Sequence, residues 1–259
     1  MLYVHENNMH SKIAANYKHK GREIQGFFDN EYIPMRTRIT ALTFDEDHLD
    51  SFSIAADEFN AYYSRIEAFS SANGISSQSK FASTFLEELS CYLFKDLPEI
   101  RDGVFGVFNK GVYAGLKIDN NRHIAIIKKD VDFCIGKKVN ISIDGQPSVE
   151  LILPIVAVEV KTYLDATMFG EIKSSSKSIR SASPNSKAYV LMGYKCIADE
   201  HIIAARQDAT LTEMFGLRAG EHMPIQSSVL FDYWKEIKET VSSITEDDIV
   251  PVSGKLLNP

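Results

Sequence analysis

One stretch of this sequence, Leu151 to Lys161 (LILPIVAVEVK), constrains the fold more than any other because it joins a buried strand to two charges. Its first eight residues are apolar or proline, as in a strand buried on both faces. Side chains two positions apart on a strand point to the same face, so Glu159 and Lys161 share one face. Burying two opposite charges there is costly, and we therefore expect a compensating partner nearby.

The partner that the sequence offers is Asp132. It follows the apolar strand predicted at His123–Ile127, and a short link between the two strands would bring it beside Glu159. Asp130 lies on the same face and is the alternative, but Asp132 has the more apolar neighbours. Two carboxylates on adjacent strands repel each other unless a cation lies between them, and oxygen ligands select a hard ion such as Mg²⁺. We predict that Asp132, Glu159 and the main-chain carbonyl of Val160 hold Mg²⁺.

Together, Asp132, Glu159 and Lys161 resemble the catalytic core of the PD-(D/E)XK nuclease superfamily, which includes most type II restriction endonucleases. The resemblance extends from about Ser79 to Tyr194, and the usual proline before the aspartate is replaced by valine. It implies a type II site-specific endonuclease that hydrolyses double-stranded DNA with one or two Mg²⁺ ions. In such an enzyme Lys161 orients the attacking water and stabilises the transition state.

A helix predicted at Gln78–Lys95 precedes these strands, as the first core helix of the superfamily does. A glutamate on that helix often completes the metal environment or braces the lysine, so the resemblance implies a catalytic role for Glu87 or Glu88. Two ordinary solvated acids are the alternative. The segments SKFASTFLEEL and VEVKTYLDATM look like restriction enzymes that cut CTNAG-centred sites, including the two-subunit cutters of CCTNAGC. The resemblance also implies a companion methyltransferase.

The order helix, strands, helix, strand predicts an α/β protein in which helices flank a mixed central β-sheet. We expect a restriction-endonuclease-like core with an N-terminal helical elaboration. The predicted division is a helical region at 1–75 that contacts DNA or the core, and a catalytic domain at 76–259. The remaining expected elements are a helix at Asp45–Ala72, a hairpin turn at Asn109–Gly111, a helix after Lys161, strands at Lys187–Tyr194 and His201–Ala205, helices at Ala209–Leu217 and Val229–Ile244, and a tail from Asp247.

Three segments are candidates for DNA contact, although the net charge of −7 argues against indiscriminate coating of nucleic acid. The region Met1–Thr43 is basic and would serve as a DNA arm or as a solvated helical face. Arg206 and Gln207 suit bidentate reading of guanine and adenine, or else belong to a solvated helix cap. The phosphate-contacting set, which has no acid between its members, is Lys173, Lys177, Arg180 and Lys187.

Other features limit the location and the class of protein. No apolar run reaches about 18 residues and the N-terminus lacks the pattern of a signal peptide, so we expect a cytoplasmic protein. Cys91, Cys134 and Cys196 are odd in number and widely spaced, and we expect them to be reduced core residues. No nucleophile elbow and no phosphate loop is present, which disfavours a serine hydrolase and ATP use.

Cutting both strands of a duplex with one metal site per chain usually requires two chains. We therefore expect a homodimer, or a heterodimer with a related subunit. Two other functions remain open: a structure-specific repair nuclease on the same core, and a catalytically silent DNA-binding subunit. In the silent subunit, Glu159 and Lys161 would form a structural ion pair.

Overall fold

The computed structural model describes residues 2–76, 79–142, 147–208 and 210–245. Its helices are α1 (Val4–Ala14), α2 (Gly21–Phe27), α3 (Ile33–Thr40), α4 (Leu49–Ala72), α5 (Ser83–Leu93), α6 (Pro98–Arg101), α7 (Ala166–Ala182), α8 (Asp199–Asp208) and α9 (Ser227–Thr245), with short helical turns η1 (Tyr17–His19) and η2 (Phe28–Tyr32). Its strands are β1 (Gly106–Phe108), β2 (Val112–Ile118), β3 (Ile124–Lys129), β4 (Phe133–Ile141), β5 (Val149–Leu164), β6 (Lys187–Lys195) and β7 (Glu213–Gly216).

Strand β5 is the hub of the sheet because its 16 residues pair with three other strands. It runs antiparallel to β4 and parallel to β2 and β6. In the described residues the sheet has seven strands. Five of them follow the order β1-β4-β5-β2-β3, and in addition β6 pairs with β5 and β7 pairs with β6. The predicted α/β class with a mixed central sheet is therefore confirmed.

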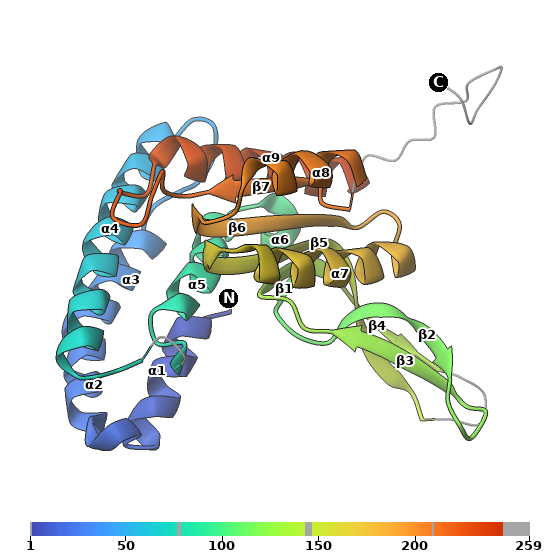
Figure 1. The fold of residues 1–259 in the computed structure, drawn as a ribbon, viewed down its shortest axis with the longest axis horizontal. Coiled ribbons are helices and arrows are strands. Elements are labelled where there is room, and N and C mark those ends of the chain that lie inside the picture. The colour runs from blue at the N-terminus through green and yellow to red at the C-terminus, as the bar shows by residue number, and fades with distance from the viewer. Residues whose placement is uncertain (1, 77–78, 143–146, 209, 246–259) are drawn as a thin grey trace.

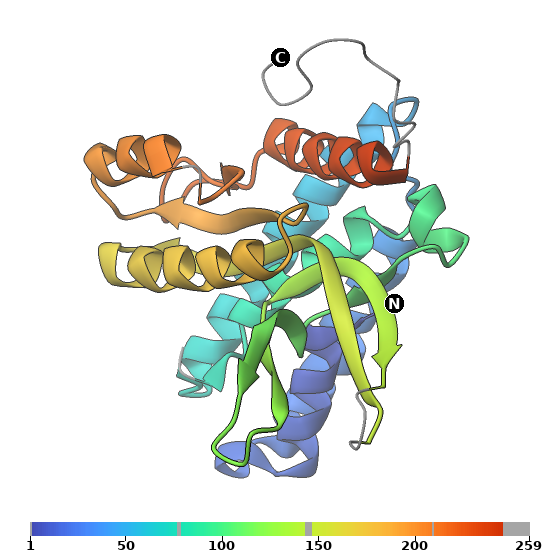
Figure 2. The same ribbon diagram turned by 90° about the vertical axis from the view of Figure 1, so that its right-hand side faces the viewer.

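Helices cover both faces of this sheet, and alternate residues of β5 face different helices. Val156 and Val158 belong to a core that includes Tyr233 of α9, whereas Ala157 packs with Ile179 of α7. Figures 1 and 2 show β6 lying between α9 and α7. The charged residues at the end of β5 therefore have apolar layers on both sides of the strand that carries them.

The N-terminal helices share the core of the sheet rather than standing apart from it. The long helix α4 crosses α9, where Phe52 meets Trp234 edge to face at 5.6 Å between ring centroids. Helix α1 packs on α5 through a fully buried polar contact, in which the His5 ring bonds to Tyr62 and Thr84. Contact of this region with the core is thus observed, and contact with DNA stays a prediction.

Most basic residues of Met1–Thr43 are engaged within the protein. Lys12 donates to the carbonyl of Ser79, and Arg38 makes two hydrogen bonds with Glu58. Arg36 pairs with Glu6, and Lys18 and Lys20 also have partners within the chain. This pattern favours the helical-face interpretation of the segment over that of a DNA arm.

Three local expectations were wrong because tertiary pairing overrides local pattern. Asn109–Gly111 does not join a hairpin: β1 pairs with β4, whereas β2 pairs with β3 and β5. His201–Ala205 is part of helix α8, and the segment predicted as a helix at Ala209–Leu217 contains strand β7. Short apolar runs fit either periodicity, and β7 forms because the edge of β6 is open for pairing.

The remaining expectations concern the cysteines, membrane-spanning helices and the C-terminal tail. Cys91 and Cys134 are buried as expected, but Cys196 is exposed. No helix among the described residues is both long enough and apolar enough to cross a bilayer. The predicted tail from Asp247 to Pro259 lies outside the described residues.

We predict that Trp234→Ala lowers the free energy of unfolding by about 3–5 kcal/mol, because it removes a large side chain from the contact between α4 and α9. Trp234 is 1% exposed, and its indole nitrogen has no hydrogen-bond partner among the residues that the structure describes. Trp234→Phe, which keeps most of the volume and loses no hydrogen bond, is the matched control and should cost much less. Urea denaturation measures both, and equal losses would contradict the packing interpretation.

Candidate active site

At the end of β5, one ammonium group lies between two carboxylates. Lys161 Nζ is 3.1 Å from Asp132 Oδ2 and 3.1 Å from Glu159 Oε2. The backbone N–H of Val160 also donates to Asp132 Oδ2, at 2.7 Å. The three side chains are each between 17% and 27% exposed, so the cluster is largely shielded but open on one side.

A bulge in the sheet brings these side chains to one face. From Ile141 to Gly136 the residues of β4 pair with Val149 to Pro154, and beyond that point the register shifts by one residue. Phe133 therefore pairs with Val158, which puts Asp132 opposite Glu159. A one-residue slip in register turns every side chain to the other face, so without the bulge Asp132 and Glu159 would point apart.

Two local features account for the bulge. Pro154 has no N–H to donate to the ladder, which makes it a position where regular pairing is interrupted. Gly136, opposite it, lies so close to the carbonyl oxygen of Leu153 that any Cβ there would collide with it. A glycine and a proline facing each other thus create the shift in register.

Burial and neighbouring charges together set the pKa values of Lys161 and Glu159. Burial favours the neutral amine of Lys161, but the adjacent carboxylates of Asp132 and Glu159 outweigh it and raise the pKa of Lys161. Burial is also the largest cause of the raised pKa of Glu159, and Asp132 adds to it, while Lys161 opposes both. Lys161 is therefore a fixed positive charge and not a base.

The two adjacent glutamates of α5 have different surroundings. Glu88 is fully buried and accepts hydrogen bonds from the hydroxyls of Tyr32 and Tyr92 and from the backbone N–H groups of His5 and Glu6. It ties α1 and η2 to α5. Glu88 is therefore a structural residue.

Glu87 lies near the carboxylate cluster instead. Its pKa is raised to about 7, first by burial and then by the charge of Asp132, whereas Lys80 and Lys161 lower it. The charges of Asp132, Lys161 and Glu159 thus act on Glu87, and its catalytic role stays a prediction. Sequence reasoning missed Lys80, whose left-handed backbone (φ 57°) just before α5 has no signal in the sequence pattern.

Asp130, the alternative to Asp132, is outside the cluster. It is exposed and accepts a hydrogen bond from the backbone N–H of Gly111 at 3.1 Å, which stabilises the turn before β2. The side chain of Val160 belongs to the core on the opposite face of the sheet from Lys161. Only the backbone of Val160 is thus available to the site.

The donor set fits a hard cation of the Mg²⁺ type. The hydrogen bonds to Asp132 and Glu159 within the described residues use Oδ2 and Oε2, so each carboxylate keeps a second oxygen. Counting Glu87, whose pKa is shifted by the charges of the cluster, the carboxylates of Asp132, Glu159 and Glu87 outnumber the ammonium of Lys161. Among the described residues no three His, Cys, Asp or Glu side chains form a ready metal cluster. Mg²⁺ is commonly bound through one or two carboxylates, with waters and phosphate oxygens as the other ligands.

The predicted phosphate contacts of α7 form one stripe. Lys173, Lys177 and Arg180 are spaced i, i+4, i+7, and their stripe borders the buried face of the helix, where Lys173 lies over the ring of Phe169. Lys173 and Arg180 also take part in interactions within the chain, and Lys177 is exposed. The remaining predicted contacts are Lys187, which is exposed at the start of β6, and Arg206 and Gln207 of α8, whose side chains lie outside the described part of the structure.

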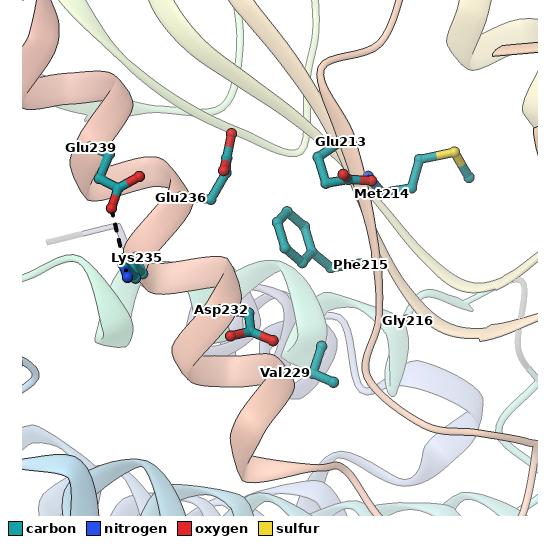
Figure 3. A pocket seen from close by; sticks show the side chains of 9 residues that line it. All are labelled: Glu213, Met214, Phe215, Gly216, Val229, Asp232, Lys235, Glu236 and Glu239. Atoms are coloured by element: carbon teal, nitrogen blue, oxygen red, sulfur yellow. Dashed lines mark hydrogen bonds and ion pairs between the residues drawn. The ribbon is translucent and has the colours of Figure 1, made fainter. Parts of the chain in front are cut away.

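A hollow of about 480 Å³ between β7 and α9 has the opposite charge (Figure 3). Its acidic residues are Glu213, Asp232, Glu236 and Glu239, and Lys235 lies 3.9 Å from Glu239. Such a surface repels the phosphate backbone of DNA. The acidic hollow and the basic stripe of α7 lie on different faces of the sheet.

Comparison with known proteins relates this fold to restriction enzymes. A family model described as Bpu10I restriction endonuclease matches residues 78–242. Among solved structures the chain is similar to a chain of the native BbvCI A2B2 tetramer, with a TM-score of 0.76 and 16% identity over 95% of this chain and 99% of that chain. At this identity the likeness concerns the fold, and it confirms the predicted restriction-endonuclease-like architecture. No match was found among curated protein sequences.

The raised pKa of Glu87 predicts a pH dependence of stability. Because its pKa is about 7 in the folded protein against an ordinary value of 4.5, the folded state binds more protons between these values, and stability falls as pH rises through that window. The glutamine in Glu87→Gln cannot titrate. The free energy of unfolding of this variant, relative to that of the wild type, should therefore rise by up to about 3 kcal/mol from pH 4.5 to above pH 7. Denaturation in EDTA across this range tests the effect, and parallel curves would contradict it.

Proposed function

The chain belongs to the Bpu10I restriction endonuclease family, and from this premise we propose how its site acts on DNA. This membership confirms the enzyme class expected from the sequence, a type II restriction endonuclease. We propose that the chain hydrolyses phosphodiester bonds of double-stranded DNA with Mg²⁺ as its cofactor, in a restriction-modification system. The observation that carries the proposal is the ammonium of Lys161 between the carboxylates of Asp132 and Glu159.

In the proposed mechanism, each residue of the cluster has a separate task. Asp132 and Glu159 would hold the cation, and the carbonyl of Val160 would be a further ligand. When bound, Mg²⁺ activates a water molecule and neutralises the charge that develops on the phosphate. Lys161, held protonated by its neighbours, orients the water and stabilises the negative charge of the transition state.

Glu87 has a distinct task in this proposal. Burial raises its pKa to about 7, so it exchanges a proton near neutral pH. A group with such a pKa at the edge of the cluster suits proton transfer, or bracing of Lys161 once DNA excludes water. The reaction needs no covalent intermediate and leaves a 5′-phosphate, as in the PD-(D/E)XK superfamily to which we assign the site.

The finer assignments rest on the sequence resemblance. We propose that the enzyme belongs to the branch that cuts CTNAG-centred sites, and that a methyltransferase protects the same sites. The phosphate contacts would come from Lys173, Lys177, Arg180 and Lys187, and the base contacts from Arg206 and Gln207. Those on α7 lie on the face of the sheet opposite α9, the helix that borders the acidic hollow.

We further propose that the chain works with a second chain, either a copy or a related subunit. One metal site cuts one strand, and the structurally similar BbvCI is an A2B2 tetramer. In Figure 1, the outer ends of β2 and β3 extend beyond the helices, and these strands carry the exposed apolar residues Leu116, Ile118 and Ile124. Exposed apolar groups on an extension suit a subunit contact.

A catalytically silent subunit is the second candidate function. The ion pairs of Lys161 with Asp132 and Glu159 would serve that role as a purely structural feature, and the valine at position 131 departs from the usual proline. The two candidates differ in their response to cations. A silent subunit should show no gain in DNA affinity when Mg²⁺ or Ca²⁺ is added.

We predict that Glu159→Ala, Lys161→Ala and Asp132→Asn each reduce cleavage of supercoiled plasmid by at least about a hundredfold, because each removes part of the charge arrangement. Conversion to nicked and linear DNA measures the effect, with the chain alone and together with its related subunit. Asp130→Asn is the matched control for Asp132→Asn and should cut like the wild type. Near wild-type cutting by folded Glu159→Ala and Lys161→Ala would overturn the site assignment.

We also predict that Ile118→Asp weakens association with the second chain, because it introduces a charge into an apolar contact. Ile118 is 74% exposed, so the isolated chain should stay folded. Lys117→Asp, whose side chain points to the other face of β2, is the matched control. Light scattering with DNA bound measures the assembly; a wild-type protein that is monomeric there would contradict the two-chain proposal.

A further inference from the structure

A cavity of about 460 Å³ lies next to the site, and residues of α5 and β5, two elements that carry site residues, contribute to its lining. It is lined by residues of α4, the start of α5, the ends of β5 and β6, and the segment after β7. Ser83 of its lining lies one helical turn before Glu87, and Tyr163 lies two residues after Lys161 on β5. Its volume falls in the range of sites that bind small molecules.

Aromatic rings form much of its wall. Tyr163 of β5 and Tyr194 of β6 lie beside each other, with ring centroids 6.1 Å apart and planes inclined by 33°. Tyr163 is 38% exposed, so its ring is available to a ligand. Tyr63 of α4 lines the same cavity. Flat rings at the surface of a nucleic-acid enzyme offer stacking surfaces for bases.

A buried guanidinium lies among these rings. The guanidinium of Arg218 is 4.6 Å from the ring centroid of Tyr63 and 5.4 Å from that of Tyr194. It donates to the carbonyl of Glu221 at 2.9 Å and to the hydroxyl of Tyr63 at 3.4 Å. Gly193 leaves room for it, because a Cβ there would lie 3.0 Å from the guanidinium.

Arg218 lacks the partner that a buried charge normally has. It is only 9% exposed, yet within the described residues no carboxylate lies within ion-pair distance of it. A guanidinium has five N–H donors, and the two hydrogen bonds to Glu221 and Tyr63 leave others unused. Burying a charge without full compensation is costly, and an incoming acceptor would offset that cost.

We propose that this cavity binds a nucleobase of the DNA substrate that has left the base stack, with guanine as the best fit. Guanine has acceptors at O6 and N7, which suit Arg218, and an amino group, which suits the carboxylates of Glu67 and Glu221 in the same lining. The two carboxylates disfavour a phosphate group. The tyrosine rings provide the stacking surface.

The position of the cavity defines which base it takes. Two residues along β5 span about 6–7 Å, which corresponds to about two base steps. The base would therefore lie within about two steps of the phosphate that is cut. This inference rests on the proposed function only for the source of the base, because the chemistry of the cavity is independent of catalysis.

The first experiment uses nucleotides without DNA cleavage. Ligand-detected NMR with the full chain measures binding of dGMP, dTMP and inorganic phosphate. We expect saturable binding of dGMP, weaker binding of dTMP and none of phosphate. Tyr163→Leu should weaken dGMP binding by about fivefold or more. Tyr113→Leu, at a half-buried tyrosine of β2 outside the cavity, is the matched control. Binding of phosphate as tight as that of dGMP, or an unchanged affinity in Tyr163→Leu, would overturn the proposal.

The second experiment uses DNA in Ca²⁺ and measures affinity against salt concentration. Arg218→Met should weaken binding to the cleavage site by between about fivefold and about 150-fold without changing the salt slope. A slope reduced by about 1 would identify a phosphate contact and overturn the proposal. Because Arg218→Met can fail to fold, Tyr163→Leu is measured in parallel. If Glu159→Ala stops cleavage while Tyr163→Leu retains wild-type affinity and site choice, the proposed function stands and the base-binding cavity does not.

Discussion

The site depends on a one-residue shift in the register of β4 against β5. The shift sets Asp132 opposite Glu159, so that Lys161 can bond to both at 3.1 Å. It arises where Pro154 interrupts the ladder opposite Gly136. Since strand side chains alternate between faces, this single shift decides whether two carboxylates and an amine meet at all.

Helix α5 separates structural from functional chemistry within two consecutive residues. Glu88 faces the N-terminal helices and accepts hydrogen bonds from His5, Glu6, Tyr32 and Tyr92. Glu87 is instead affected by the charges of the cluster at the end of β5. The buried network around Glu88 holds the helix in place, and this in turn holds Glu87. The N-terminal helices therefore contribute to the geometry of the site.

Charge is distributed so that the two faces of the sheet differ. The hollow between β7 and α9 is acidic, whereas α7 on the other face carries a basic stripe. A protein with a net charge of −7 can attract DNA to one side when its acids gather on another. This arrangement is consistent with an enzyme that engages a duplex along a limited surface.

The amino-acid sequence alone was enough to predict the hub strand, its two charged residues and the α/β class, because long apolar runs and two-residue alternation are local signals. It also indicated Asp132 and the pair of glutamates on α5, but not which of the two glutamates belongs to the site. Tertiary structure decided that Glu87 and not Glu88 approaches the cluster, that Asp130 stabilises a turn instead, and that β7 is a strand. These outcomes depend on strand register and on helix packing, which arise from contacts between residues far apart in the chain.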